Sequence, residues 1–122
     1  MPKPKNLPTI IIVLVIFAII ILAFIFRQPN QILFYSNSCP HCQKVEEYIN
    51  ANGIRNKLKF RELEVATNQN NAQILLQKAQ SCGLDTTQGV GIPVFFNGSK
   101  CLQGDTAIIN YFEQQKWKSF TI

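Results

Sequence analysis

A run of 17 residues without a polar side chain, Ile10 to Phe26, constrains most strongly how this chain can fold. Extended back to Leu7 it covers about 20 residues, and as an α-helix it measures about 26 to 30 Å, the thickness of a hydrocarbon core. The alternative is a cleaved signal peptide, whose apolar core is usually about 7 to 15 residues long and ends in small residues. Because the bulky Phe24–Phe26 do not suit such a cleavage site, we interpret residues 7–26 as an uncleaved transmembrane signal anchor.

The charges that flank this run predict its orientation. Lys3 and Lys5 precede it together with the amino terminus, and only Arg27 follows it closely. The positive-inside rule therefore places residues 1–6 in the cytoplasm and the rest of the chain outside the inner membrane of a bacterial cell, in a compartment where disulfides persist. Residues 27–31 form a linker that spans about 17 Å when fully extended, so we expect the following domain to lie at the membrane surface.

The overall charge of +5 raises the alternative of a nucleic-acid-binding protein, and the position of the charges argues against it. Three of the 12 basic residues flank the apolar run, which leaves nine against all seven acidic residues in the remaining chain. A nearly neutral domain without a basic stripe is not expected to bind nucleic acid.

Cys39-Pro40-His41-Cys42 lies between an apolar run ending at Tyr35 and an amphipathic run, the pattern of a strand followed by a helix. The first N–H groups of a helix are unpaired and its amino end carries partial positive charge. We expect Cys39 at the N-cap, Pro40 at the first helical position and His41 as a further group that stabilises the Cys39 thiolate. The thiolate is the nucleophile in disulfide exchange, and Cys42, one turn on, can close onto it. The alternative for His41 is a solvated helix residue.

Other uses of this cysteine pair are an inert structural disulfide, a zinc site and a copper carrier. A zinc site usually has four ligands, but the single histidine lies inside the motif and the other cysteines, Cys82 and Cys101, stand apart. A Cu(I) carrier would hold the metal through two thiolates, and the chain has no methionine cluster because Met1 is its one methionine. We therefore expect redox chemistry, with no bound metal and no cofactor.

Hydrophobic periodicity predicts one α/β domain over residues 32–115, in the order β-α-β-α-β-β-α and with a four-stranded mixed sheet. The expected elements are a strand at Ile32–Tyr35, a helix at Pro40–Asn52 ended by Gly53, a strand at Leu58–Val65, a helix at Asn71–Ser81 ended by Gly83, a hairpin of Gly91–Phe96 and Lys100–Leu102 with a type I′ turn at Asn97-Gly98, and a helix from Gly104-Asp105-Thr106 to about Gln115. In Leu58–Val65 the apolar positions change parity, which indicates either a bulge or a strand covered on both faces.

The stretch Phe34–Cys42, together with Gly91–Val94 about fifty residues later, resembles the thioredoxin superfamily in its short glutaredoxin-like form. The resemblance implies that Pro93 follows a cis peptide bond, lies against the active-site cysteines and lets the backbone of Ile92 pair with an extended substrate. The tetrapeptide is similar to that of the DsbA-type disulfide oxidases, although their inserted helical domain is absent. Residues 104–108 lack the second glycine and the paired acidic residues usual in glutathione-binding glutaredoxins.

Two further features remain open at the level of sequence. Cys82 and Cys101 are interpreted as a structural disulfide, as two buried free thiols or as a second redox couple that exchanges electrons with the first. Residues 116–122 form an amphipathic tail with Trp117 and Phe120 between lysines, which either contacts the lipid interface or continues a helix on the sheet.

Together these patterns predict a membrane-anchored, extracytoplasmic thiol-disulfide oxidoreductase that donates disulfides to exported proteins. Cys39 is expected to attack, Cys42 to resolve the mixed disulfide, Pro40 and His41 to stabilise the thiolate, and Ile92 and Pro93 to position the substrate. The expected partners are proteins that carry thiols or disulfides and a membrane redox partner such as a quinone-linked oxidase. The alternatives are an outward-facing disulfide reductase and a Cu(I)-binding carrier.

Overall fold

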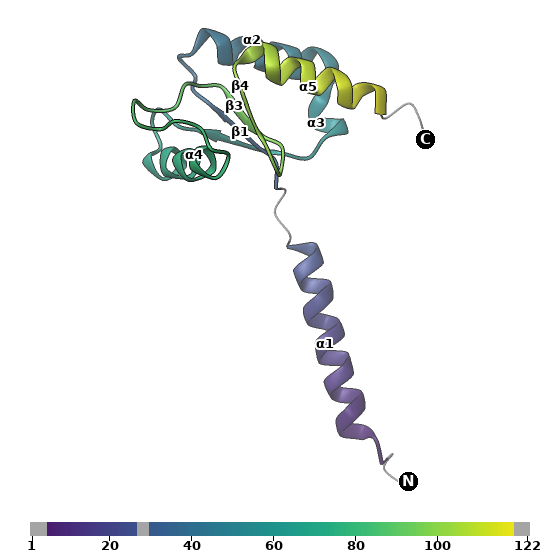
Figure 1. The fold of residues 1–122 in the computed structure, drawn as a ribbon. Coiled ribbons are helices and arrows are strands. Elements are labelled where there is room, and N and C mark those ends of the chain that lie inside the picture. The colour runs from purple at the N-terminus through teal and green to yellow at the C-terminus, as the bar shows by residue number, and fades with distance from the viewer. Residues whose placement is uncertain (1–4, 27–29, 119–122) are drawn as a thin grey trace.

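The computed structural model describes residues 5–26 and 30–118, with side chains up to residue 115. It begins with helix α1 (Leu7–Ile25), in which no residue is buried against the described part of the chain. α1 stands apart from the folded domain (Figure 1). Among the described residues it is the one helix that is long and apolar enough to cross a membrane. The predictions for Lys3, Arg27 and Phe120, and for the side chain of Trp117, lie outside what the structure describes.

A four-stranded mixed sheet forms the centre of the domain, in the order β2-β1-β3-β4. Strand β1 (Ile32–Tyr35) pairs in parallel with β2 (Arg61–Glu64) and antiparallel with β3 (Val94–Phe96), and β3 pairs antiparallel with β4 (Cys101–Gln103). The parallel pair requires a crossover connection, which α2 (Pro40–Asn52) provides together with a short helical turn, α3 (Ile54–Lys57). The predicted fold class is confirmed.

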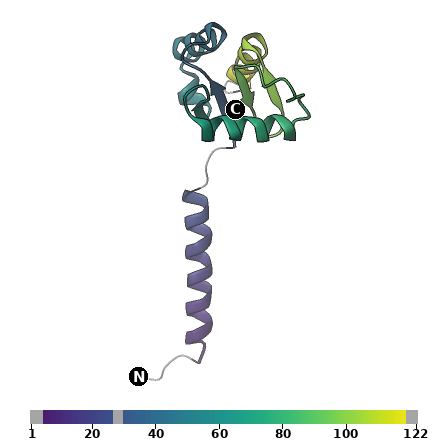
Figure 2. The same cartoon turned by 90° about the vertical axis from the view of Figure 1, so that its left-hand side faces the viewer.

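Helices cover both faces of this sheet (Figures 1 and 2). α2 and α5 (Asp105–Lys118) lie side by side on one face, and α4 (Gln69–Ser81) lies on the other. The alternation of side chains along β1 and β3 separates two apolar clusters. Leu33 and Phe95 pack under α2 and α5, whereas Phe34 and Val94 pack against α4. The inner face of α2 therefore rests on buried side chains of β1 and β3.

The second strand is shorter than predicted. The structure has β2 at Arg61–Glu64 instead of Leu58–Val65. Residues 58–60 instead connect β2 to the helical turn α3, which the sequence did not predict. Phe60 packs in the cluster under α2 and α5, and Leu63 and Val65 pack in the cluster against α4. The apolar residues on the side of α2 and α5, Leu58 and Phe60, precede β2, so the change of parity spans the start of the strand and does not show that β2 itself is covered by apolar residues on both faces.

Other details also differ from the prediction. β3 begins at Val94 instead of Gly91, and β4 is Cys101–Gln103 instead of Lys100–Leu102. α4 begins two residues early, because the side chain of Asn68 caps it by accepting a hydrogen bond from the Asn71 N–H. The β3–β4 turn is not type I′, which requires positive φ at both central residues; Gly98 has a φ of 101° and Ser99 has a negative φ, while Asn97 pairs with Lys100 across the turn. α5 extends to Lys118, beyond the expected end near Gln115.

Candidate active site

The site begins where β1 ends. Cys39 is the N-cap of α2, with extended backbone angles, and Pro40 occupies the first helical turn. The Cys39 Sγ atom accepts a hydrogen bond from the Cys42 N–H at 3.3 Å, so the sulfur receives an N–H group that the helix itself leaves unpaired. Both this N–H donor and the helix dipole direct positive partial charge toward the Cys39 sulfur. The prediction that Cys39 is the N-cap of this helix is confirmed.

The two cysteines of the motif are free thiols in unlike surroundings. Cys39 is half-buried, whereas Cys42 is buried, with 5% of its surface exposed. Burial, followed by the hydrogen bond with Cys39, raises the pKa of Cys42 to about 12. A molecule in solution can therefore reach the sulfur of Cys39 more easily than that of Cys42, and Cys42 stays protonated near neutral pH. This asymmetry matches an attacking and a resolving thiol.

The Ile92–Pro93 peptide bond is cis and lies beside Cys39. The Cys39 thiol points to the carbonyl oxygen of Ile92, with 3.9 Å between Sγ and O. Pro93 is fully buried, and its own carbonyl accepts a hydrogen bond from the Gly104 N–H at 2.9 Å. This bond ties the proline loop to the start of α5, so that residues 92–93 and 104–105 meet beside Cys39.

His41 contacts Asp105, a residue at the start of α5 for which the sequence predicted no role in the site. Its Nδ1 atom lies 3.2 Å from Oδ2 of Asp105, and Nζ of Lys44 lies 3.7 Å from the same oxygen. The hydrogen bond from His41, with a further one from the Thr106 N–H, lowers the pKa of Asp105. An ionised carboxylate has no proton to donate, so Nδ1 of His41 carries the hydrogen. His41 is thus held by α5, and Asp105 and Lys44 join the predicted site residues.

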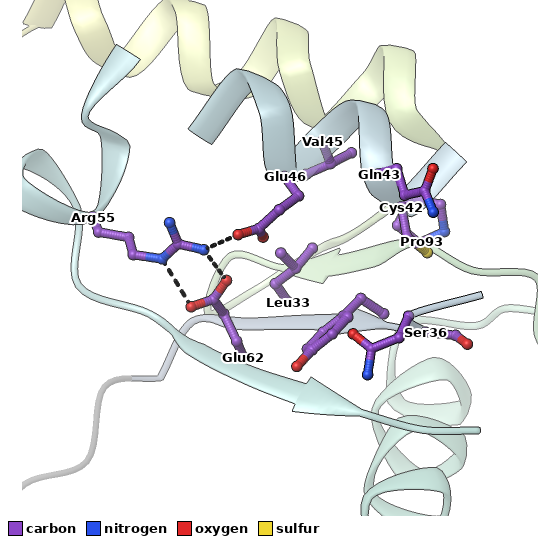
Figure 3. A pocket seen from close by; sticks show the side chains of 11 residues that line it. Leu33, Ser36, Cys42, Gln43, Val45, Glu46, Arg55, Glu62 and Pro93 are labelled. Carbon is purple, nitrogen blue, oxygen red and sulfur yellow. Dashed lines mark hydrogen bonds and ion pairs between the residues drawn. The ribbon is translucent and has the colours of Figure 1, made fainter. Parts of the chain in front are cut away.

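A cavity of about 290 Å³ lies beneath Cys42 and Pro93. Figure 3 shows Cys42 and Pro93 at one end of it and an ion-pair cluster at the other. In this cluster the guanidinium of Arg55 contacts Glu46 at 2.6 Å and Glu62 at 2.7 Å. These contacts raise the pKa of Arg55, chiefly through the hydrogen bonds to Glu62 and then Glu46. The cluster joins α2, α3 and β2 below the active site, and no motif in the sequence indicated it.

Cys82 and Cys101 are joined in a disulfide, which is inconsistent with the free-thiol alternative. The bond connects the C-cap of α4 to the first residue of β4. Cys101 pairs with Phe96, which pairs in turn with Ile32 at the start of β1. Cys39 follows the other end of β1, so the length of the sheet separates the two cysteine pairs. Direct sulfur exchange between them does not fit this arrangement.

Comparison with known proteins finds no matching family model and no matching curated protein. Among solved structures, the chain is similar to a buckwheat glutaredoxin-glutathione complex, with 17% identity over 74% of each chain and a TM-score of 0.48. It is similar to reduced glutaredoxin C1 from Populus tremula x tremuloides, with 16% identity over 75% of this chain and 69% of that chain and a TM-score of 0.48. It is also similar to oxidized glutaredoxin 2 from Chlamydomonas reinhardtii, with 19% identity over 76% of this chain and 84% of that chain and a TM-score of 0.47.

Proposed function

We propose that this protein is a thiol-disulfide oxidoreductase. The observation that carries the proposal is the asymmetry of its two free thiols: Cys39 caps a helix and is accessible, whereas Cys42, three residues on, is buried with a raised pKa. A structural cysteine pair has no need of such a difference. An exchange enzyme needs it, because one sulfur must meet the substrate and the other must wait.

The reaction follows from this geometry. The Cys39 thiolate attacks one sulfur of a substrate disulfide, so that a Cys39–substrate bond forms, the substrate disulfide breaks and its other sulfur leaves as a thiolate. Cys42 then loses its proton and attacks Sγ of Cys39. The Cys39–Cys42 disulfide forms and the substrate is released with both of its thiols, having gained two electrons from the protein. Every step is reversible, so the same residues pass a disulfide to a reduced substrate when the reaction runs backwards.

We further propose that α1 anchors the protein in the inner membrane of a bacterial cell and that the domain faces outward. In that setting the reaction runs toward disulfide donation to exported proteins, with a membrane redox partner such as a quinone-linked oxidase restoring the Cys39–Cys42 disulfide. The support is the length and composition of α1 and the similarity of the tetrapeptide to disulfide oxidases. Residues 92 and 93 would pair with the substrate, through the backbone of Ile92.

The test compares single substitutions in the full chain. Cys39→Ser should abolish exchange with a disulfide peptide, whereas Cys42→Ser should still attack once and accumulate a mixed disulfide through Cys39, visible by mass spectrometry. If Cys39→Ser retained turnover and Cys42→Ser lost every covalent adduct, the assignment of the attacking sulfur would be wrong. If wild-type protein catalysed no exchange with any disulfide, the enzyme proposal itself would fail.

The direction of electron flow follows from the reduction potential of the Cys39/Cys42 couple, equilibrated against glutathione buffers. For a two-electron couple about 30 mV corresponds to a tenfold change in equilibrium. A potential above about −150 mV fits a disulfide donor, in the range of known oxidants. One below about −250 mV would identify a reductant instead and contradict the donor role.

A further inference from the structure

A groove of about 470 Å³ opens beside Cys39, on the face of the sheet that α4 covers. Its walls come from the end of β2, from α4 and from the loop before Pro93, and they are mainly apolar. The apolar lining residues are Val65, Ala66, Ala72, Leu75, Leu76, Val90 and Ile92. The groove is continuous with the reacting sulfur, because Cys39 itself and Ser38 form its rim. α2, which carries His41, lies on the other face of the sheet (Figure 1).

The charge distribution around Cys39 is one-sided. Among the described residues that line the groove, only Cys39 has an ionisable side chain, whereas His41, Lys44 and Asp105 gather on the side of α2 and α5. A ligand such as glutathione carries two carboxylates and an amine, and these groups lose hydration in a groove that offers them no charged partner. An apolar group gains from the same surroundings.

Leu76 is the large apolar residue of the groove lining that is exposed to solvent. It is 40% exposed, whereas its neighbour Leu75 is 6% exposed and belongs to the core. An exposed leucine beside a reacting sulfur leaves apolar surface that a substrate can cover during the reaction. The carbonyl of Ile92, 3.9 Å from Cys39 Sγ, lies at the same rim and is a hydrogen-bond acceptor for the backbone of an extended chain.

We infer that the groove binds an apolar side chain of a polypeptide substrate, two residues from the cysteine that reacts with Cys39. Alternate side chains of an extended segment point to the same side, about 7 Å apart, so a segment that presents its cysteine to Cys39 also presents this residue to the groove. The inference rests on the proposed exchange activity and names its substrate class: polypeptides with leucine-like residues near the cysteine, in preference to glutathione.

The experiment uses the full chain in detergent, reduced, with peptides that each carry one cysteine as a mixed disulfide with the same small thiol. The peptides differ only at the positions two residues before and after the cysteine, which are Leu, Ser, Glu or Lys. Wild-type protein should react with the Leu peptide at least about tenfold faster, by kcat/KM, than with the Ser peptide. It should discriminate similarly against oxidised glutathione.

Leu76→Glu supplies the matched change. It should abolish the preference for the Leu peptide and make the Lys peptide the best substrate, a gain that a misfolded protein cannot produce. Gln77→Glu is the control, because it adds the same charge to the next position of α4, outside the groove lining, and should keep the wild-type order. Circular dichroism checks that both variants are folded.

Equal rates for the Leu, Ser and Glu peptides would overturn the inference and leave the exchange activity intact. A second result would also overturn the inference. In that case Leu76→Glu keeps the wild-type order of peptides but changes the oligomeric state or the binding to phosphatidylcholine vesicles. The groove would then bind a second copy of the chain or the lipid surface. Failure of every peptide and of glutathione to react would instead remove the proposed function, and the inference with it.

Discussion

Asp105 shows how a single residue can affect a site that lies 64 residues earlier in the chain. Its carboxylate accepts a hydrogen bond from His41 and lies 3.7 Å from Nζ of Lys44. One carboxylate therefore contacts both the imidazole of His41 and the ammonium of Lys44. A thiolate on Cys39 experiences all three, and its stability sets how strongly the Cys39–Cys42 disulfide oxidises.

Substitution of Asp105 by Asn should make the protein a stronger oxidant at pH 8.5, where an ordinary histidine is neutral. Removal of the carboxylate leaves the charge of Lys44 unbalanced, which stabilises the thiolate and hence the reduced form. The equilibrium constant with glutathione should shift by up to about fivefold, the range of an exposed ion pair. Asp105→Glu keeps the charge and should behave as wild type. A shift toward weaker oxidation would contradict this account.

The raised pKa of Cys42 gives a prediction about reactivity and pH. Iodoacetamide at pH 8 should modify Cys39 in the folded, reduced protein and leave Cys42 unmodified, because a thiol with a pKa of about 12 is almost entirely protonated there. Peptide mapping by mass spectrometry reads the outcome, and both cysteines should react in denaturant. Equal modification of the two in folded protein would show that Cys42 is not buried.

The same group also affects stability. Its folded pKa of about 12 lies above the ordinary value of 9.0, so the folded state holds the proton more tightly than the unfolded state. The stabilising contribution is complete below pH 9 and is lost as the pH rises toward 12, because the unfolded chain then releases a proton that the folded chain keeps.

At the scale of elements, two contacts connect the helices and strands around Cys39 and Cys42. The Cys82–Cys101 disulfide joins α4 to β4, and the Arg55 cluster joins α3 to α2 and β2. Neither contact includes an active-site residue. Each contact fixes an element that lines a cavity beside Cys39 or Cys42. We therefore expect the loss of either contact to lower the free energy of unfolding more than it lowers the rate of disulfide exchange.

Replacement of both Cys82 and Cys101 by Ser should lower the free energy of unfolding by about 3 kcal/mol, the value for a loop of this length. The length of the loop that the disulfide closes follows from the separation of the two cysteines, which is 19 residues in sequence. Urea unfolding of the oxidised wild type and of the double variant measures the difference, with peptide exchange followed in parallel. If exchange disappeared while the fold remained stable, the disulfide would have a redox role after all.

Arg55→Gln should cost about 1 kcal/mol, because the side chains are 29 to 46% exposed and water screens such pairs. The loss should shrink in 1 M salt, where the Debye length falls to about 3 Å. Lys57→Gln is the control, since it removes the same charge from the same short helix α3. An equal loss in both variants would mean that overall charge, and not the cluster, is responsible.

At the scale of the whole molecule, α1 is the element on which the proposed location depends. Its apolar side chains are 41 to 75% exposed, an arrangement that costs free energy in water and is favourable in lipid. The domain, by contrast, has its own core and a nearly neutral composition. The molecule thus consists of a folded α/β domain and a separate apolar helix that is long enough to cross a membrane.

The full chain should therefore remain in the membrane fraction after alkaline carbonate extraction. In right-side-out vesicles treated with an impermeant phosphine, a membrane-impermeant maleimide should label Cys39, because the positive-inside rule places the domain outside. The control is Cys39→Ser in a chain that also carries Cys82→Ser and Cys101→Ser, because the phosphine would otherwise free those two thiols for labelling. Labelling that appears only after the vesicles are opened would place the domain in the cytoplasm and remove the extracytoplasmic role.

Much of this organisation could be predicted from short stretches of sequence. The membrane-length helix follows from one uninterrupted apolar run, and the N-cap role of Cys39 and the end of α2 at Gly53, which has a φ of 60°, follow from residues within one turn. The two-face covering of the sheet is visible as an uninterrupted apolar run in β1. These features depend on covalent neighbours, helical periodicity and backbone preference, all of which act over a few residues.

The features that the sequence did not predict depend on the order of the strands in the sheet. The bond between His41 and Asp105, the Arg55 cluster and the groove beside Cys39 each bring together residues from elements distant in sequence, and a shift of one strand would separate them. The Gly98-Ser99 turn differs from prediction for a similar reason, because the pairing of β3 with β4 selects its central residues. Local sequence therefore determined which sulfur can become a thiolate, whereas tertiary packing decided what surrounds it, since side-chain contacts across a sheet follow from strand register and not from local preference.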